Sequence, residues 1–485
     1  MMVANEISID TRVLKMAHDL AAAGPRVTLL GLSPSGVREV LPLGRAEVIR
    51  LPHGRARTID QTRPRDRYAR ILAMIEVTRR WPRTLGRPVR GLLWLMIKTH
   101  RAARPLARKA RRKWHSLAAR FSAARLRMSR HTDWRSTLPI VAEYEAVFGP
   151  ELDGLQPDVI HAQDVHLLGV GARAVERAAA TGRAVKLIYD SHEYVQGLGT
   201  FSPHVVAGWA SLEREYIDRA DRIITVSPGI AAMLTRDYHL ETAPVVVMNI
   251  PPVVRGGTTT VRGAAGVGEN DPLVVYSGGI SQVRGIHTLV EAVGRLDGVH
   301  LALVIPARYQ YVLDLEEKAR KGGYADRLHT VPYVEPQHVV GFLESATVGA
   351  SPIVSGPINH EVTLPNKIFE YMHARLPIVI SDCKAMSDFV KDLEIGEVFV
   401  SEDVGSLTTT LSYVLANLSE YHAAYDRQPD LLERYSWRTE RRKLFAVYRD
   451  MLGEDAVAAE IDSEELPSLI QSSEASPTGA VEGKT

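Results

Sequence analysis

The sequence alternates short apolar strands with helix-length segments over most of its length, and this alternation restricts the fold more than any other feature. In the first half we expect helices at residues 11–23, 169–180, 212–220 and 228–235. Between them we expect strands at residues 26–32, 157–164, 185–193, 222–227 and 245–250. Short strands joined by helices form parallel βαβ units. The first half therefore predicts a doubly wound α/β sheet.

The alternation restarts after a stretch rich in Pro, Gly and Thr at residues 251–272, which we interpret as a linker. Beyond it we expect strands at residues 273–279, 300–306, 328–334, 348–354 and 377–381. We expect helices at residues 286–296, 311–322, 339–346 and from 365 onward, and a last amphipathic helix at 436–452. The chain is thus predicted to form two Rossmann-like halves. Ligands of such sheets bind at the carboxyl ends of strands, here in the cleft between the halves.

The same pattern predicts the domain boundaries. We expect an N-terminal domain at residues 1–250 with a basic helical insertion at about 60–135, a C-terminal domain at 251–434, and a final helix at 435–453. Residues 454–485 are acidic and rich in Ser, so we expect a disordered tail. The first strand, MMVA, is shorter than a buried central strand should be, which leaves open a natural start upstream of Met1.

Composition excludes several classes of protein. Cys383 is the single cysteine, so neither an internal disulfide framework nor a multi-cysteine metal site can form. The longest apolar run, Leu92–Ile97, is far shorter than the roughly 20 residues that span a bilayer. The net charge of +2 hides seventeen Lys or Arg and no acidic residue within residues 77–132, so the rest of the chain carries −15. This balance argues against a nucleic-acid binder and predicts one surface that meets anions. The single cysteine fits a reducing setting, so we expect a cytoplasmic protein.

The basic insertion contains a single apolar stripe at helical spacing, surrounded by Arg and Lys. Its members are Leu106, Ala110, Trp114, Leu117, Phe121, Ala124 and Met128. Such a helix suits an anionic membrane leaflet. The alternative is that the stripe packs on the N-terminal domain with its cations in solvent, but the apolar run at Leu92–Ile97 favours the membrane. The sequence therefore predicts peripheral binding to the inner face of the plasma membrane through Arg79–Arg130.

Residues 364–379 read LPNKIFEYMHARLPIV and predict a short helix with one polar and one apolar face. Pro365 suits the first helical position, which leaves the N–H groups of Asn366 and Lys367 free at the helix start. Free N–H groups beside a lysine form an anion site, whereas Glu370, on the same face, suits hydroxyl groups. Taken alone, the stretch is equally consistent with a solvated helix start before a buried strand.

The loop after the first strand of the second half contains Gly278, Gly279 and Arg284. The two glycines allow a ligand to approach the backbone closely, and the arginine can bind a phosphate with a fork of donors. A tight turn with a solvated arginine is the alternative for this loop alone.

Polar side chains follow two strands of the first half, namely His161 with Asp164, and Asp190 with His192 and Glu193. We interpret His161 as structural, whereas the two carboxylates around His192 favour a functional role at the carboxyl end of its strand. The acids form no compact Asp-x-Asp run, and no His-x-x-x-His pair lies on a helix. We therefore expect no obligatory metal.

These segments together resemble the retaining glycosyltransferases of family 4, also called group 1. The similarity runs from Met1 to about Leu452 apart from the insertion. It rests on NEISIDTRVLKMAHDLAAAG, PDVIHAQD, LIYDSHE, RADRIITVSPGIAAML, YSGGISQVRGIHTLVEAV, LPNKIFEYMHARLPIV and SWRTERRKLFAVY. The resemblance implies the GT-B fold of two facing Rossmann-like domains. It also implies a nucleotide-diphosphate sugar as donor, no cofactor, and a glycan or lipid-linked acceptor in cell-envelope or polysaccharide synthesis.

The family's roles carry over onto matching positions of this sequence. Glu370 corresponds to the glutamate that holds the ribose hydroxyls, and Pro365–Lys367 to the helix start that faces the donor phosphates. Arg284 stands at a basic position of the family, and His192 corresponds to the histidine near the transferred sugar. The last helix, with Trp437, corresponds to the segment that crosses back onto the N-terminal domain.

The resemblance thus yields three sets of site residues. The predicted catalytic residues are His192, Arg284 and Lys367. The predicted donor-binding residues are Gly278, Gly279, Arg284, Glu361, Pro365, Asn366, Lys367 and Glu370. The predicted acceptor-side residues are Asp10, Arg12, Asp164, Asp190 and Glu193.

Two departures from the family pattern stand out. The family often has a second glutamate at the position of Val362, and Glu361 is out of register by one residue. Ile280 and Ser281 stand where a second basic residue is usual. The sequence therefore keeps two other functions open: an epimerase or hydrolase of nucleotide sugars with the same fold, and a non-catalytic scaffold at the membrane.

Overall fold

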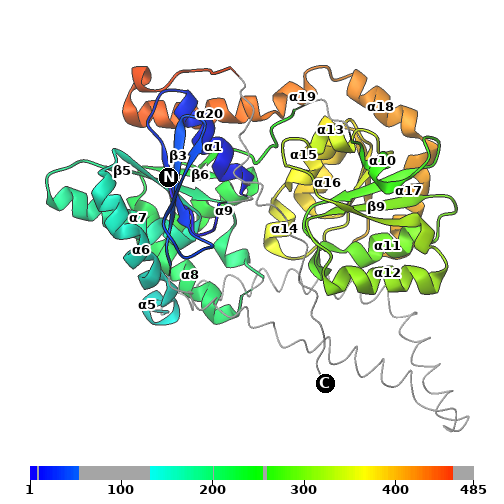
Figure 1. The fold of residues 1–485 in the computed structure, drawn as a ribbon, viewed down its shortest axis with the longest axis horizontal. Helices are drawn as coiled ribbons and strands as arrows, with labels where there is room; N and C mark the ends of the chain where they lie inside the picture. Colours follow the sequence, from blue (N-terminus) through cyan, green and yellow to red (C-terminus); the bar gives the residue numbers. More distant parts are fainter. Residues whose placement is uncertain (8–9, 54–131, 200, 255–258, 463–485) are drawn as a thin grey trace, which may run out of the picture.

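The computed structural model describes residues 1–7, 10–53, 132–199, 201–254 and 259–462 (Figure 1). Almost all of the predicted basic insertion, including its apolar stripe and the Leu92–Ile97 run, lies outside the described residues. The tail from residue 463 onward also lies outside them. Within the described residues the chain forms two α/β halves, each built on its own sheet, as predicted (Figure 1).

The first residues of the chain lie at the centre of the N-terminal sheet. Leu30 donates its N–H to the Met1 carbonyl at 2.9 Å, and Gln163 donates to the Met2 carbonyl at 3.0 Å. Met2 therefore joins β1 to β4, and the strand order is β2-β3-β1, Met2, β4-β5-β6-β7. The strands are β1 (Thr28–Leu32), β2 (Glu39–Leu43), β3 (Ala46–Leu51), β4 (Val159–Gln163), β5 (Lys186–Ser191), β6 (Arg222–Thr225) and β7 (Val245–Val246).

Helices cover both faces of this sheet. They are α1 (Thr11–Ala22), α5 (Trp134–Thr137), α6 (Ile140–Leu155), α7 (Val165–Ala180), α8 (Pro203–Tyr216) and α9 (Pro228–Tyr238), with 3₁₀ turns η1 (Val195–Gly197) and η2 (Ile217–Arg219). Ser202 and Ser227 cap α8 and α9, each followed by a proline at the first turn, which explains why these helices begin where they do. The sequence patterns missed α6 and the antiparallel β2–β3 pair at the sheet edge.

The C-terminal sheet is parallel throughout its described strands, in the order β10-β9-β8-β11-β12-β13. The strands are β8 (Leu273–Ser277), β9 (His300–Ile305), β10 (Leu328–Pro332), β11 (Val348–Ser351), β12 (Ile378–Ser381) and β13 (Gly396–Phe399). The chain runs outward from β8 to β10 and then returns to β11 on the other side of β8. The carboxyl end of β8 is therefore the switch point of the sheet, where α/β folds bind their ligands.

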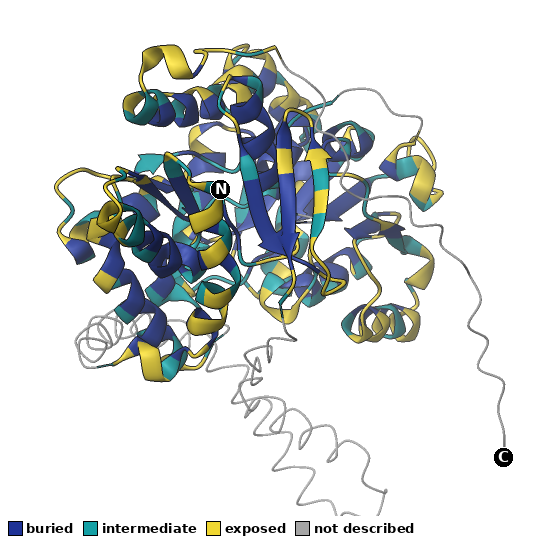
Figure 2. Cartoon of the chain, turned by 60° about the vertical axis from the view of Figure 1, so that its left-hand side comes forward, coloured by how far each residue is buried: buried dark blue, intermediate teal, exposed yellow. Residues whose placement is uncertain are grey.

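The helices of the C-terminal half include several that the sequence patterns did not predict. They are α10 (Val261–Ala265), α11 (Ile286–Gly294), α12 (Gln310–Gly322), α13 (Val339–Leu343), α14 (Ile358–Val362), α15 (Asn366–His373), α16 (Lys384–Asp392), α17 (Val404–Ala416), α18 (Leu418–Asp426) and α19 (Leu431–Arg434), with 3₁₀ turns η3 (Gln282–Arg284) and η4 (Ala325–Arg327). The interpretation of residues 251–272 as a plain linker was wrong at α10, because Val261 is fully buried in the core of this half. Figure 2 shows that the strands are mostly buried, while exposed residues lie mainly on helices and loops.

The last helix, α20 (Trp437–Leu452), packs on α1 of the N-terminal half (Figure 1). Trp437 donates its indole N–H to Asp19 at 2.7 Å, which fixes the start of α20 against α1. The predicted disorder from residue 454 was wrong for the first nine residues. They form the 3₁₀ turn η5 (Glu454–Ala456), bury Val457 and pair Glu460 with two arginines of α20, because an apolar residue and a carboxylate find partners there.

Candidate active site

The loop after β8 brings backbone and a cation to the switch point of the C-terminal sheet. Gly278 has a φ of +109° and Gly285 a φ of +70°, a region that side chains with a Cβ rarely adopt. A Cβ at Gly285 would lie 1.9 Å from the Pro352 carbonyl oxygen, so only glycine fits there. Arg284 closes η3 immediately before this glycine. The loop is thus held in one shape that positions Arg284.

Helix α15 lies beside this loop and presents its polar residues to the end of β8. Pro365 is the N-cap, with a ψ of 149°, and not the first helical residue as the sequence indicated. Its extended backbone shifts the helix start by one residue, to Asn366. The prediction that one arc of the helix is polar is correct, but Lys367 and Glu370 are only 7% and 6% exposed.

Two contacts place these buried side chains. Glu370 Oε2 accepts a hydrogen bond from Ser277 Oγ at 3.1 Å. The ammonium of Lys367 lies 3.9 Å from the centre of the Tyr276 ring, a cation–π contact. A Cβ on Gly278 would lie 3.7 Å from the same ammonium, so the glycine loop and the lysine are neighbours.

Burial shifts the protonation of both α15 side chains toward their neutral forms. Burial and, to a smaller extent, the charge of Arg284 lower the pKa of Lys367 to about 7, against the opposing charge of Glu370. Burial raises the pKa of Glu370, while Lys367 and the hydrogen bond from Ser277 oppose that rise. An anion that binds beside Arg284 and Lys367 stabilises the charged form of the lysine. Anion binding and protonation of Lys367 therefore favour each other.

Glu361 does not face this site with a free carboxylate. Its Oε1 accepts from the Gly356 N–H at 2.6 Å, and its Oε2 accepts from the Lys384 N–H, the first of α16, at 2.9 Å. The carboxylate thus caps α16 and closes the loop before α14. Val362, the next residue, packs on the N-terminal half, where a Cβ at Gly229 would lie 2.8 Å from the Val362 Cβ.

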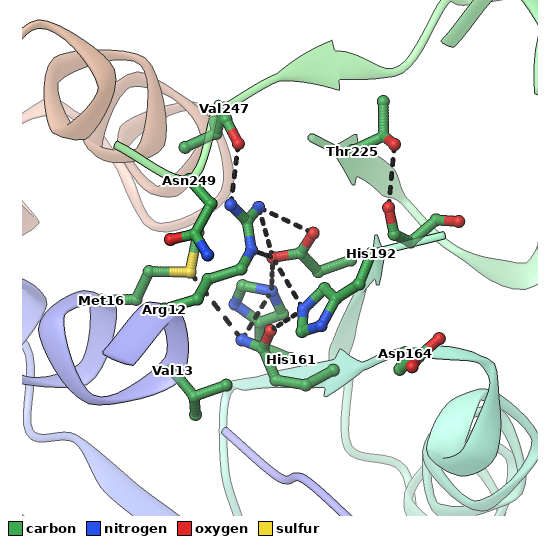
Figure 3. A network of polar contacts seen from close by, with 12 residues as sticks. Arg12, Val13, Met16, His161, Asp164, His192, Thr225, Val247 and Asn249 are labelled. Carbon is green, nitrogen blue, oxygen red and sulfur yellow. Dashed lines mark hydrogen bonds and ion pairs between the residues drawn. The ribbon is translucent and has the colours of Figure 1, made fainter. Parts of the chain in front are cut away.

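In the N-terminal half, His192 lies just after β5 and beside a buried ion pair (Figure 3). Arg12 binds both carboxylate oxygens of Asp190 at 2.8–3.0 Å and donates to the Val247 carbonyl at 2.8 Å. Asp190 Oδ2 lies 3.7 Å from Nε2 of His192 and 3.7 Å from Nε2 of His161. Arg12 and Asp190 are 3% and 0% exposed, so the structure buries this ion pair next to His192.

The ion pair sets the protonation of the two histidines differently. Burial lowers the pKa of His161, and the nearby Asp190 only partly opposes it. Burial acts in the same direction on His192, but there the charge and the hydrogen bond of Asp190, together with the charge of Asp164, outweigh it and the pKa is raised. Burial also acts to raise the pKa of Asp190, yet Arg12 and the histidines hold it well below its usual range. Asp190 therefore stays a carboxylate and favours a charged His192.

The remaining acceptor-side residues divide into two kinds. Asp10 caps α1 by accepting from the Val13 N–H at 3.3 Å, which is a structural role. Asp164 caps α7 with a φ of +66°, a strained conformation of the type that collects at functional sites. Glu193 follows His192 with an exposed side chain, yet partial desolvation of its carboxyl raises its pKa against the opposing charges of His192 and Arg284.

The two halves meet next to these residues. Asn359 on α14 accepts from the Tyr194 N–H at 3.0 Å and donates to the Tyr194 carbonyl at 3.1 Å. Tyr194 directly follows Glu193, and the charge of Arg284 reaches Glu193 from the other half. The structure therefore brings His192 and Glu193 opposite the loop and helix that carry Arg284, Lys367 and Glu370.

Sequence reasoning missed four polar residues of this arrangement: Gln163, Ser277, Tyr276 and Asn359. Gln163 had a visible signal, since a glutamine within an apolar strand must find partners when buried. Ser277 and Tyr276 end an apolar strand in the same way. Asn359 gave no such signal, because its partner depends on how the halves meet.

The described residues hold no group of three or more His, Cys, Asp and Glu side chains arranged to bind a metal ion. Their helices include none that is both long and apolar enough to cross a bilayer.

Comparison with known proteins assigns the family. Residues 9–249 match the model described as Glycosyltransferase Family 4, and residues 271–417 match the model described as Glycosyl transferases group 1. The chain belongs to the family 4 (group 1) glycosyltransferases. As such, it is an enzyme that uses a nucleotide sugar. No curated protein sequence matches this glycosyltransferase.

Solved structures agree on the fold. Sucrose-phosphate synthase from Thermosynechococcus elongatus is 14% identical to this glycosyltransferase, with a TM-score of 0.61 over 90% of this chain and 92% of that chain. HepE from Anabaena, solved in complex with UDP, is 18% identical, with a TM-score of 0.51 over 64% of this chain and 82% of that chain. The two α/β sheets of this glycosyltransferase, parallel in their described strands except at the β2–β3 edge, are typical of GT-B.

Proposed function

We propose that this glycosyltransferase moves a sugar from a nucleotide-diphosphate donor to a glycan or lipid-linked acceptor in cell-envelope or polysaccharide synthesis, with retention and without a metal. The observation that carries the proposal is the position of Arg284, Lys367 and Glu370 at the switch point of one sheet, opposite His192 of the other. Residues 251–434 bind the donor in this proposal, and residues 1–250 bind the acceptor.

Donor binding follows from the chemistry of the C-terminal half. Arg284, Lys367 and the first N–H groups of α15 bind the diphosphate, close to the backbone of Gly278 and Gly279. Glu370 accepts hydrogen bonds from the ribose hydroxyls. Its carboxylate already accepts from Ser277, which orients the second oxygen. The proposal gives Glu361 no part in donor binding, because each of its oxygens already accepts from a backbone N–H group.

The transfer step needs stabilisation of the leaving group more than a protein nucleophile. The bond from the anomeric carbon to the phosphate oxygen breaks, and negative charge grows on the diphosphate, where Arg284 and Lys367 stabilise it. The acceptor hydroxyl attacks the same face of the sugar, and its proton passes to the departing phosphate oxygen. His192 orients the sugar and the acceptor. The two cations supply the positive charge that a metal provides in other enzymes.

A thermal-shift screen of nucleotide sugars identifies the donor. HepE, which shares the fold, has been solved with UDP and with UDP and glucose, so UDP-glucose is the first compound to test. We expect one base and one sugar to raise the melting temperature selectively. Proton NMR of the product then gives the anomeric configuration, and an inverted product would overturn the proposed stereochemistry.

Glu370→Ala tests the donor site directly. Loss of a hydrogen bond to a charged group costs about 1.5–3 kcal/mol, so we expect roughly a 10- to 150-fold weaker affinity for the nucleoside diphosphate in calorimetry. Glu397→Ala is a control in the same half, since Glu397 accepts from Tyr421 on the far edge of the sheet. Unchanged nucleotide affinity in Glu370→Ala would contradict the site assignment.

The membrane part of the proposal rests on the sequence alone. We propose that Arg79–Arg130 bind an anionic leaflet and bring the enzyme to a lipid-linked acceptor. Deletion of residues 101–130 should reduce sedimentation with anionic liposomes and leave nucleotide binding intact. Equal sedimentation of the parent and the deletion variant would rule out this surface as the anchor.

A further inference from the structure

A chain of hydrogen-bonded side chains runs beneath His192 and ends on the last helix. His192 Nε2 lies 2.8 Å from Gln163 Oε1, and Gln163 Nε2 lies 3.2 Å from His161 Nε2. His161 Nδ1 in turn lies 2.9 Å from the hydroxyl of Tyr448 on α20. Gln163 and His161 are fully buried and Tyr448 is 5% exposed, so water does not compete for these bonds.

The chemistry of the amide fixes the direction of every bond in this chain. An amide oxygen only accepts and an amide nitrogen only donates. His192 Nε2 therefore carries a hydrogen, because its partner is Gln163 Oε1. His161 Nε2 must be bare, because its partner is the amide nitrogen. Nδ1 of His161 then holds the proton and donates to Tyr448.

We propose that Gln163 and Tyr448 are positioning residues, which hold His192 as the Nε2–H tautomer and leave its Nδ1 for the substrate. This inference rests on the proposed role of His192 beside the transferred sugar. Neutral His192 then accepts at Nδ1 from a hydroxyl of the sugar or the acceptor. Protonated His192 donates from the same atom to an oxygen.

The charge of Asp190 acts on both histidines that flank Gln163. Its Oδ2, which Arg12 holds in place, lies 3.7 Å from Nε2 of His192 and 3.7 Å from Nε2 of His161. In the orientation that the structure shows, the hydrogen that faces this carboxylate is on His192, and turning the Gln163 amide around would place it on His161. The first arrangement agrees with the opposite shifts of the two residues, because the pKa of His192 is raised and that of His161 is lowered. The other charged groups that act on His192 are Asp164, on the cap of α7, and its neighbour Glu193.

The chain also connects the last helix to the reaction. Helix α20 follows the entire donor-binding half in the sequence, yet its Tyr448 reaches a strand of the opposite half. If α20 is displaced, the Nδ1–H of His161 loses the Tyr448 hydroxyl as its acceptor. The Gln163 amide then loses its fixed orientation, and His192 is no longer held in one tautomer. The inference therefore gives α20 a role in catalysis beyond covering the sheet.

Imidazole nitrogen NMR on the full-length protein tests the inference without any substrate. The signals of His192 and His161 are assigned by their loss in His192→Ala and His161→Ala. We expect the parent to show a bare Nδ1 on neutral His192 and a bare Nε2 on His161. Gln163→Leu should turn His192 into a tautomer mixture. Gln163→Glu should raise the pKa at which His192 titrates, because it adds a negative charge.

Tyr448→Phe removes one hydroxyl, and Tyr425→Phe is its matched control. Tyr425 is equally buried and donates its hydroxyl to the Leu376 carbonyl at 2.9 Å in the other half. Both variants should lose similar stability, but only Tyr448→Phe should change the His161 and His192 signals. A parent with Nδ1–H on His192, or a Gln163→Leu variant with unchanged signals, would overturn the inference.

Activity separates this inference from the proposed function. With the donor selected in the screen, Gln163→Leu should lower kcat about 10- to 100-fold, the range known for partners that orient metal-bound histidines. It should leave nucleotide affinity unchanged. If His192→Ala keeps full activity while the NMR result holds, then the proposed role of His192 fails and the hydrogen-bonded chain stands. If the NMR result fails while His192→Ala is inactive, only the inference about the hydrogen-bonded chain is refuted.

Discussion

Replacing Asn359 by alanine removes two hydrogen bonds that join the halves beside the proposed site. The amide of Asn359 pairs with both the N–H and the carbonyl of Tyr194, at 3.0 and 3.1 Å. Each bond contributes about 0.5–1.5 kcal/mol, so the pair stabilises the joined arrangement by about 1–3 kcal/mol. This corresponds to roughly a 5- to 150-fold change in the equilibrium between joined and separated halves. We expect kcat/KM to fall by a factor in this range, because His192 lies two residues before Tyr194.

The assay compares steady-state transfer with nucleotide binding. Calorimetry with UDP should give the parent affinity for Asn359→Ala, since the proposed nucleotide contacts all lie in the C-terminal half. Small-angle scattering should show a larger radius of gyration for this variant. Asn270→Ala, at an exposed turn before β8, is the control and should match the parent in all three measurements. The reasoning is refuted if Asn359→Ala keeps the parent kcat/KM and radius, or if UDP binding weakens as much as kcat/KM does.

Three further predictions concern the donor site. Since the pKa of Lys367 is lowered to about 7, the free enzyme loses that proton as the pH rises through 7, and an anionic donor restores it. Calorimetry in buffers of different ionisation enthalpy should show proton uptake on nucleotide-sugar binding above pH 7, absent in Lys367→Met; equal uptake in both would contradict the assignment. Gly285→Ala should unfold at much lower denaturant than Gly298→Ala, because both have a φ of +70° but only Gly285 faces a carbonyl oxygen at 1.9 Å; equal losses of about 1 kcal/mol would show that the clash relaxes. Glu361→Ala should lose about 1–3 kcal/mol of unfolding free energy as two N–H groups lose their acceptor; a selective loss of affinity for UDP-glucose over UDP would instead show that Glu361 binds the sugar.

Much of the fold could be predicted from the sequence, because apolar periodicity reports directly on burial. The strands that end in Gln163, Ser191 and Ser277 were found in this way, and so was the pairing of each with the next helix. The β2–β3 pair was missed because β2 lies at an edge, where burial and hence the pattern are weak. Helix α10 was missed because five residues rich in Gly and Ala resemble a linker.

The candidate site was predicted in outline and not in detail. The polar arc of α15 was found from helical spacing, but its burial was not, since a single helix does not show what covers it. Arg12 was expected on the acceptor side, but its buried ion pair with Asp190 could not be predicted, because the two residues lie 178 positions apart in the sequence. Contacts that depend on the meeting of two halves, such as Asn359 with Tyr194, leave no trace in local patterns.

The position of α20 also determines the order in which the protein can fold. One core of the N-terminal half combines Val13 and Leu29 with Phe445 and Val457, from opposite ends of the sequence. The cores of the C-terminal half draw their buried residues from within residues 250–431. During synthesis the C-terminal half can therefore complete its core first. The N-terminal half leaves the ribosome earlier but keeps one apolar face of its sheet partly uncovered until the last helix emerges.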